Sequence, residues 1–298
     1  MTALHQIFLR HDTLADQLRT ACILECTAPK PGNVTPVHAF ADTSYQDFIR
    51  SAEVVAPILA CSSQNGAGRS LRDAVTATRD AVGTNTNLGM LLLLAPLAAI
   101  PLEQTCSTGI AAALDGLDME QTRFIFEAIR LAQPGGLGRS RSHDVTDDPQ
   151  VSIVAAMALA PHDRIAFQYT HAFTDVLDWG KPRFLECLNV GMNWDAAVVR
   201  VHLELLARQS DSLILRKCGP EMTARAQFRA KQTIAAWPFG TTPPEELHQF
   251  DAWLRADGHR RNPGTTADLL AAILFAAIRD GDWCPPESVQ VPAVRSQS

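Results

Sequence analysis

Apolar residues recur at helical spacing along most of the chain, and this pattern predicts an all-α protein. In the first half it predicts helices at residues 4–26, 45–60, 70–81, 90–100, 102–115 and 118–132. In the second half it predicts helices at residues 151–160, 164–177, 184–190, 195–208, 223–236, 245–257 and 269–278. No alternating strand pattern and no repeat of fixed period stands out. We therefore expect one helical bundle of about ten or more helices over residues 1–283, followed by a loosely ordered tail at 284–298.

Residues 83–100 are the most distinctive stretch of the chain. From Leu88 onward it is almost wholly apolar, and at this length it is typical of a buried helix. The preceding turn is small and polar, and its Asn85 and Asn87 are suited to capping. A helix N-terminus presents free backbone N–H groups and the positive end of the helix dipole, so it can hold a phosphate. The simpler alternative is that Asn85 or Asn87 only caps a core helix.

Composition excludes several classes of protein. The chain has 298 residues, a formal net charge of −6 and no run of Lys or Arg, so we expect neither a nucleic-acid partner nor a membrane partner. The apolar run at 88–100 is too short to cross a bilayer. Seven scattered cysteines without a C-x-x-C pair argue against a zinc site or a disulfide framework. We expect a cytoplasmic protein whose helix faces would allow a homo-oligomer.

Five polar segments interrupt the apolar helical pattern, and each has a structural explanation as a turn, a cap or a solvated face. They are Glu25 with residues 30–33, Asn85 with Asn87, residues 139–144, residues 262–268, and Asp211 with Arg216 and Lys217. Together they combine four carboxylates with four cations: Glu25, Asp144, Asp211 and Asp268 with Lys30, Arg139, Arg216 and Lys217. Such a set can hold a nucleotide polyphosphate together with a divalent cation.

Four of these segments resemble motifs of the triphosphoribosyl-dephospho-coenzyme A synthase family. Residues 25–34, which contain Lys30-Pro31-Gly32-Asn33-Val34, are similar to its E-x-x-x-x-K-P-G-L-V element. Residues 83–89 (G-T-N-T-N-L-G) are similar to its G-V-N-T-H-K-G, and residues 211–219 to its D-[ST]-x-[ILV]-x-R-x-G. Residues 262–270 (N-P-G-T-T-A-D-L-L) resemble its N-x-S-P-G-G-[ST]-A-D-L-L-A close. The matches follow the family order and span roughly residues 20–275.

The resemblance implies an all-α transferase that uses ATP as a substrate. In this family the 2′-hydroxyl of 3′-dephospho-coenzyme A displaces adenine from the ribose C1′ of ATP, which yields a prosthetic-group precursor. Positive charge develops at the ribose carbon, so nearby carboxylates stabilise it and one can accept the hydroxyl proton. Mg²⁺, Lys or Arg side chains and helix N-termini are expected to fix the triphosphate.

The resemblance also implies roles for individual residues. Glu25, Asp211 and Asp268 are candidates for the general base and for Mg²⁺ ligation, and His143 with Asp144 for proton transfer or a metal contact. The candidates for substrate binding are Lys30, Gly32, Asn33, Asn85, Thr86, Asn87, Arg139, Arg216, Asn262 and Gly264.

The chain departs from the family pattern at Asn87 and Leu88, where the family has a histidine and a basic residue. Arg139 and Arg141 could supply the missing positive charge. The departure motivates an alternative, a related phosphoribosyl transfer to another acceptor such as a tetrahydromethanopterin-type one-carbon cofactor. A second alternative is a non-catalytic helical protein that binds nucleotides. The joint presence of the carboxylates and cations argues against the second, because buried carboxylates without cations are costly.

Overall fold

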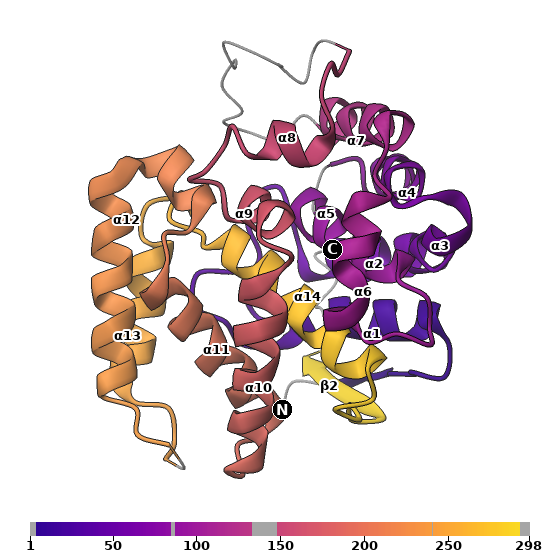
Figure 1. Ribbon diagram of the computed structural model, residues 1–298. Coiled ribbons are helices and arrows are strands. Elements are labelled where there is room, and N and C mark those ends of the chain that lie inside the picture. Colours follow the sequence, from indigo (N-terminus) through magenta and orange to yellow (C-terminus); the bar gives the residue numbers. More distant parts are fainter. Residues whose placement is uncertain (1–3, 85–86, 133–147, 240, 293–298) are drawn as a thin grey trace.

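The computed structural model describes residues 4–84, 87–132, 148–239 and 241–292, and these residues confirm the all-α expectation (Figure 1). The first half contains β1 (Leu4–Phe8), α1 (Leu14–Thr27), α2 (Tyr45–Leu59), α3 (Ser62–Asn65), α4 (Ala67–Val82), α5 (Leu88–Ala99), α6 (Cys106–Asp115) and α7 (Met119–Ala132). The second half contains α8 (Ile153–Met157), α9 (Arg164–Thr170), the π-helix η1 (Asp175–Gly180), α10 (Lys181–Asn189), α11 (Trp194–Arg208), α12 (Ser212–Ala235), α13 (Glu245–Arg255), α14 (Gly264–Arg279) and β2 (Ser288–Pro292).

Helix α14 is the central element of the fold. Its residues 269–278 are all buried, as expected for a helix that is apolar on every side. It packs against α1 and α5 on one side and against α10 and α11 on the other. In Figure 1 it runs through the middle of the molecule, between the helices of the first half and those of the second. The N-terminus of α14 therefore lies where the two halves of the chain meet.

Local signals predicted several helix boundaries correctly. Ser44 caps α2 through the backbone N–H of Asp47, whose side chain accepts from the Ser44 backbone in return. The predicted buried helix at 90–100 is α5, which begins at Leu88. The segment 211–219 and the helix predicted at 223–236 form α12, which is broken at Gly219 by a left-handed backbone (φ 81°).

Two expectations about the chain ends were wrong. Residues 4–8 do not begin the first helix but form β1, and the tail expected to be loosely ordered contains β2. The strands pair antiparallel, with Ile7 opposite Val289 and Phe8 opposite Ser288. Val289 and Val291 are buried while Gln290 between them is exposed, so β2 does alternate. Five residues are too few for this alternation to be recognised before the distant partner strand is known.

Two smaller boundaries also differ from expectation. The loop expected at residues 62–68 contains the short helix α3, and the helix expected from residue 102 begins only at Cys106. Among the described residues, no helix is both long and apolar enough to cross a bilayer.

The buried valines of β2 give a test of its place in the core. Replacing Val291 with Asp should lower the free energy of unfolding by about 3 kcal/mol, because a charge would replace a buried apolar side chain. Gln290→Asp places the same charge on the exposed neighbour and should cost less than about 0.5 kcal/mol. Urea denaturation of both variants measures the difference. Equal losses would show that β2 does not seal the core in this register.

Candidate active site

The N-termini of three long helices, α5, α12 and α14, come together at one place. Asp211, the N-cap of α12, accepts hydrogen bonds from the backbone of its own helix at Leu213 (2.9 Å) and Ile214 (3.0 Å). Its second oxygen accepts from the backbone N and the hydroxyl of Thr266 in the first turn of α14, both at 2.8 Å. One buried carboxylate therefore joins the starts of two helices.

Helix α5 reaches the same place through Gly89. A Cβ at this position would collide with the carboxylate of Asp268 and would lie 2.8 Å from Ile165 Cδ1 of α9. The absence of a side chain thus allows the start of α5 to lie directly against the first turns of α14 and α9. Neither Asn87 nor Pro263, the residues that precede α5 and α14, caps its helix with a side-chain hydrogen bond. The positive ends of both helices face this region and favour an anion there.

Three predicted carboxylates gather around these helix ends. Burial raises the pKa of the Asp268 carboxyl well above its usual range, and the negative charges of Glu25 and Asp211 raise it further, while Arg216 opposes them. Burial also raises the pKa of Asp211, which its hydrogen bonds partly offset. Asp268 itself is only partly buried. The structure therefore brings Glu25, Asp211 and Asp268 together, and Asp268 is the least buried of the three.

Glu25 is held by Lys30. The Lys30 ammonium lies 3.0 Å from Glu25 Oε1 and also donates to the Glu25 backbone carbonyl. Both side chains are buried, Lys30 completely so. Burial raises the pKa of Glu25, and the charge of Lys30 opposes this. Lys30 in this structure thus contacts the carboxylate and does not face an open phosphate position.

A buried histidine lies next to this pair. His202 of α11 is fully enclosed, and burial together with the charge of Lys30 lowers its pKa to about 3. The imidazole is therefore neutral throughout the physiological range, and Lys30 has a neutral neighbour on this side. Sequence reasoning missed His202, because nothing in its spacing relates it to residue 30.

The loop at residues 30–33 is fixed to the start of α14 and to α13. The Gly32 N–H donates to Asp251 (2.7 Å), and Arg255 donates to the Asn33 carbonyl (2.8 Å). The Asn33 amide donates to Asn262 Oδ1 at 2.7 Å, two residues before Gly264 begins α14. Gly32 has φ +80°, and a Cβ there would lie 2.9 Å from side-chain atoms of α13 and of the Arg261–Gly264 turn, so only glycine fits.

An ion pair flanks the carboxylates. Arg216 Nη1 lies 2.7 Å from Asp163 Oδ2, and both side chains are about one-third exposed. Asp163 also caps α9 through the backbone N–H groups of Ile165 and Ala166. The sequence prediction included Arg216 but missed Asp163, which could have been recognised only as a capping residue before a short helix.

Asn87 lies at the start of α5, but its amide is used within the protein. It donates to Ser51 of α2 at 2.8 Å, and so fixes the start of α5 to a neighbouring helix. The predicted site residues Asn85, Thr86, Arg139, His143 and Asp144, together with Arg141, lie outside the described residues.

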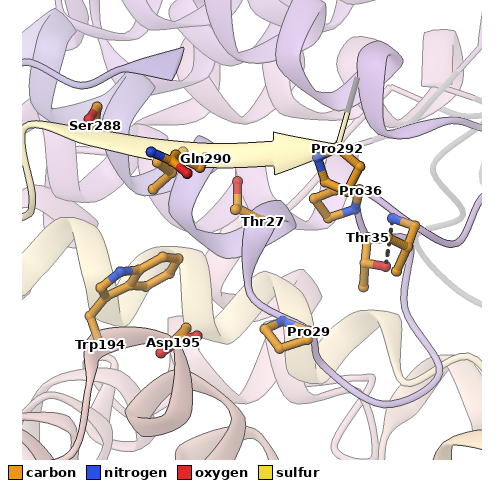
Figure 2. A pocket seen from close by; sticks show the side chains of 11 residues that line it. Thr27, Pro29, Thr35, Pro36, Trp194, Asp195, Ser288, Gln290 and Pro292 are labelled. Carbon is orange, nitrogen blue, oxygen red and sulfur yellow. Dashed lines mark hydrogen bonds between the residues drawn. The ribbon is translucent and has the colours of Figure 1, made fainter. Parts of the chain in front are cut away.

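A separate open pocket of about 390 Å³ lies beside the loop that follows α1 (Figure 2). Its lining includes Thr27, Pro29, Trp194, Asp195 and Gln290 and contains none of the predicted site residues. One carboxylate and no cation line it, so it does not suit a polyphosphate. The carboxylate cluster at the helix ends is the stronger candidate for the active site.

Comparison with known proteins identifies the family of the chain. Residues 11–285 match the family described as ATP:dephospho-CoA triphosphoribosyl transferase. The chain belongs to this family. A probable 2-(5''-triphosphoribosyl)-3'-dephosphocoenzyme-A synthase from Stutzerimonas stutzeri is 25% identical over 290 residues, which cover 89% of this chain and 90% of the relative. The crystal structure of a protein from Archaeoglobus fulgidus, described as a triphosphoribosyl-dephospho-coA synthase, is 26% identical, with a TM-score of 0.61 over 78% of this chain and 98% of that one.

Membership of the ATP:dephospho-CoA triphosphoribosyl transferase family confirms the expected fold and the expected class of enzyme. It favours ATP and dephospho-coenzyme A as substrates over both alternatives considered from the sequence, another acceptor or a non-catalytic protein. The individual site residues stay predictions, which the following variants address.

Asp211 should be essential to stability, because its four hydrogen bonds join two helix starts. Asp211→Asn should lower the free energy of unfolding by about 3 kcal/mol, since an amide cannot accept all four. Thr266→Val removes only the hydroxyl bond and should cost about 1 kcal/mol. Chemical denaturation of both variants tests this order. A smaller loss for Asp211→Asn than for Thr266→Val would contradict the double cap.

The raised pKa of Asp268 predicts a pH-dependent cost in stability. Above its folded pKa the carboxylate is ionised in both states and the native state carries the full cost. Below the ordinary pKa of Asp it is protonated in both states and the cost disappears. Asp268→Asn should therefore raise the melting temperature at pH 8 and lose this gain as the pH falls towards 4. The exposed Asp80→Asn should show no such trend. A gain that grows on acidification would overturn the assignment.

Proposed function

We propose that the cluster of Glu25, Asp211 and Asp268 is the centre at which the chain transfers the triphosphoribosyl group of ATP to the 2′-hydroxyl of 3′-dephospho-coenzyme A, with release of adenine. The observation that carries this proposal is the crowding of three carboxylates where the N-termini of α5, α12 and α14 meet. The reaction needs both features, because negative charge must face the ribose carbon and positive potential must face the triphosphate. The two substrates of this proposal, ATP and dephospho-coenzyme A, are those named in the description of the family.

Asp268 is our candidate for the general base. Its partial exposure lets an acceptor hydroxyl reach it, and its raised pKa makes it a stronger base than an ordinary carboxylate. When the hydroxyl attacks C1′ and the bond to adenine breaks, Asp268 takes the hydroxyl proton. The neighbouring charge of Glu25 stabilises the positive charge that develops on the ribose.

The helix N-termini and Arg216 are our candidates for holding the triphosphate. Arg216 is already near the cluster, where its charge acts on Asp268. Lys30 has a different role from the phosphate contact first expected. Its ammonium opposes the rise that burial causes in the pKa of Glu25 and holds this carboxylate in place, so we assign it as a positioning residue. Asp211 likewise acts by holding the starts of α12 and α14 together.

The residues present fit Mg²⁺ as a partner of the triphosphate. Among the described residues, no three His, Cys, Asp or Glu side chains form a ready metal cage. Mg²⁺ does not require one, because it is commonly held by one or two carboxylates with phosphate oxygens and water. The oxygens of Asp211 are used by backbone donors, whereas no hydrogen bond from a described residue reaches Glu25 Oε2. Glu25 would hold the ion, which would neutralise phosphate charge.

The cytoplasmic location and the homo-oligomer stay predictions.

The activity itself is tested by incubating the protein with ATP and Mg²⁺, with and without 3′-dephospho-coenzyme A. Adenine should appear only with the acceptor, and mass spectrometry should find the triphosphoribosyl adduct. Acceptor-independent adenine release, or none from folded protein, would overturn the proposed reaction.

Two variants separate the roles of the carboxylates. Asp268→Asn should lower kcat about 10³-fold without changing the Mg²⁺ concentration for half-maximal rate. Glu25→Gln should raise that concentration, because the amide is a weaker ligand than a carboxylate. If Glu25→Gln leaves Lys30 unpaired and unfolds the protein, the double variant with Lys30→Met restores charge balance. Thermal melts confirm folding, and Asp80→Asn is the control. An Asp268→Asn enzyme with normal kcat would exclude it as the base.

A further inference from the structure

The proposed reaction brings two phosphate-bearing substrates to one site, and the inference below depends on it. ATP carries a triphosphate, and dephospho-coenzyme A carries a diphosphate between its adenosine and its long pantetheine arm. The arm must extend into solvent while the adenosine 2′-hydroxyl reaches the buried cluster. The acceptor diphosphate is therefore expected at the rim of the site, where it needs cations of its own.

Most cations near the cluster are already paired with carboxylates. Arg216 pairs with Asp163, Arg164 with Asp175, and Arg255 with Asp251. Arg261, which begins the turn before α14, pairs with Asp257 at 2.9 Å. In each of these side chains a carboxylate already competes with any incoming anion.

Lys217 and Arg260 differ from these paired cations. Both are exposed, and no carboxylate of the described residues lies within ion-pair distance of either side chain. Lys217 follows Arg216 on α12, and Arg260 lies two residues before Asn262 of the site. Arg260 Nη2 donates to the Lys217 carbonyl at 2.8 Å, so the two residues are fixed next to each other although 43 positions separate them in the chain. They form a pair of cations without an ion-pair partner among the described residues, next in the chain to Arg216 and to the turn before α14.

The backbone around this pair keeps the surface open. Gly219 interrupts α12 two residues after Lys217, and a Cβ at Gly219 would have no atom within 4 Å. The Cys218 thiol lies 3.5 Å from the Arg260 carbonyl, and the negative charge of Asp257 acts on it together with the positive charges of Arg260, Arg261 and Lys217. A ligand that bridges the two cations would therefore cover Cys218.

We propose that Lys217 and Arg260 bind the diphosphate of the acceptor, dephospho-coenzyme A, at the rim of the active site. In this arrangement the adenosine points inward to Asp268 and the pantetheine arm leaves along the surface. The triphosphate of ATP stays with Arg216 and the helix N-termini. The two cations thus determine acceptor affinity and take no part in the chemistry.

Kinetics with both substrates tests this separation. Lys217→Gln and Arg260→Gln should each raise KM for dephospho-coenzyme A about tenfold, the usual cost of one charge-assisted hydrogen bond. Both variants should leave kcat and KM for ATP within about twofold. Lys231→Gln, an exposed lysine of the same helix, is the matched control and should change neither constant. An unchanged KM for the acceptor, or an equal rise in KM for ATP, would overturn the proposal.

Thiol labelling gives a second readout that does not depend on turnover. Iodoacetamide labelling of Cys218, followed by peptide mass spectrometry, should be slowed by dephospho-coenzyme A whose own thiol has been blocked by S-methylation, and not by ATP. The exposed Cys284, far from the pair in the chain, should label at the same rate throughout. Protection of Cys218 without any adenine release would support this binding site while the proposed reaction fails. Product formation without protection of Cys218 would overturn the binding site while the reaction stands.

Discussion

The structure depends on how it keeps several carboxylates buried at one place. Burial raises the pKa of Asp268, and the nearby negative charges of Glu25 and Asp211 raise it further. Two of the three are stabilised inside the protein, Asp211 by four hydrogen bonds and Glu25 by Lys30. Asp268 is left uncompensated by a comparable partner among the described residues. A crowded carboxylate of this kind costs stability, and proteins keep such groups where function requires them.

The same constraint explains why α14 is the central helix. Its apolar body is enclosed on every side, so its first turn is held with little freedom. Asp211 fixes that turn to α12, the Asn33–Asn262 bond fixes the preceding turn to the loop after α1, and Gly89 admits α5 directly against Asp268. Elements from both halves of the chain thus position one carboxylate. A change at any of these contacts should move Asp268 before it unfolds the protein.

Sequence reasoning predicted the features that local patterns and short motifs determine. The apolar runs of α5 and α14 were predicted from near neighbours alone, and the motifs pointed to Glu25, Asp211 and Asp268 as candidates. Strands β1 and β2 could not be predicted, because a strand of five residues is recognised only through its pairing, and here the partner strand lies at the other end of the chain. The enclosure of Lys30 beside His202, the double cap of Asp211 and the Asp163–Arg216 pair also depend on tertiary contacts. A motif predicts that such residues meet, but burial decides whether a lysine faces a substrate or a carboxylate.

The distribution of cations around the cluster separates two tasks. Lys30 is enclosed and stabilises a carboxylate, so it cannot also respond to a substrate without leaving Glu25 unpaired. Arg216 is partly exposed and paired, so it can exchange Asp163 for a phosphate at moderate cost. Lys217 and Arg260 are exposed and have no ion-pair partner among the described residues, and so an anion can bind there without breaking an existing ion pair. The buried cation thus stabilises a carboxylate, whereas the exposed cations are available to bind a substrate. This order is what a transferase needs when one substrate must be held deep and the other must enter from solvent.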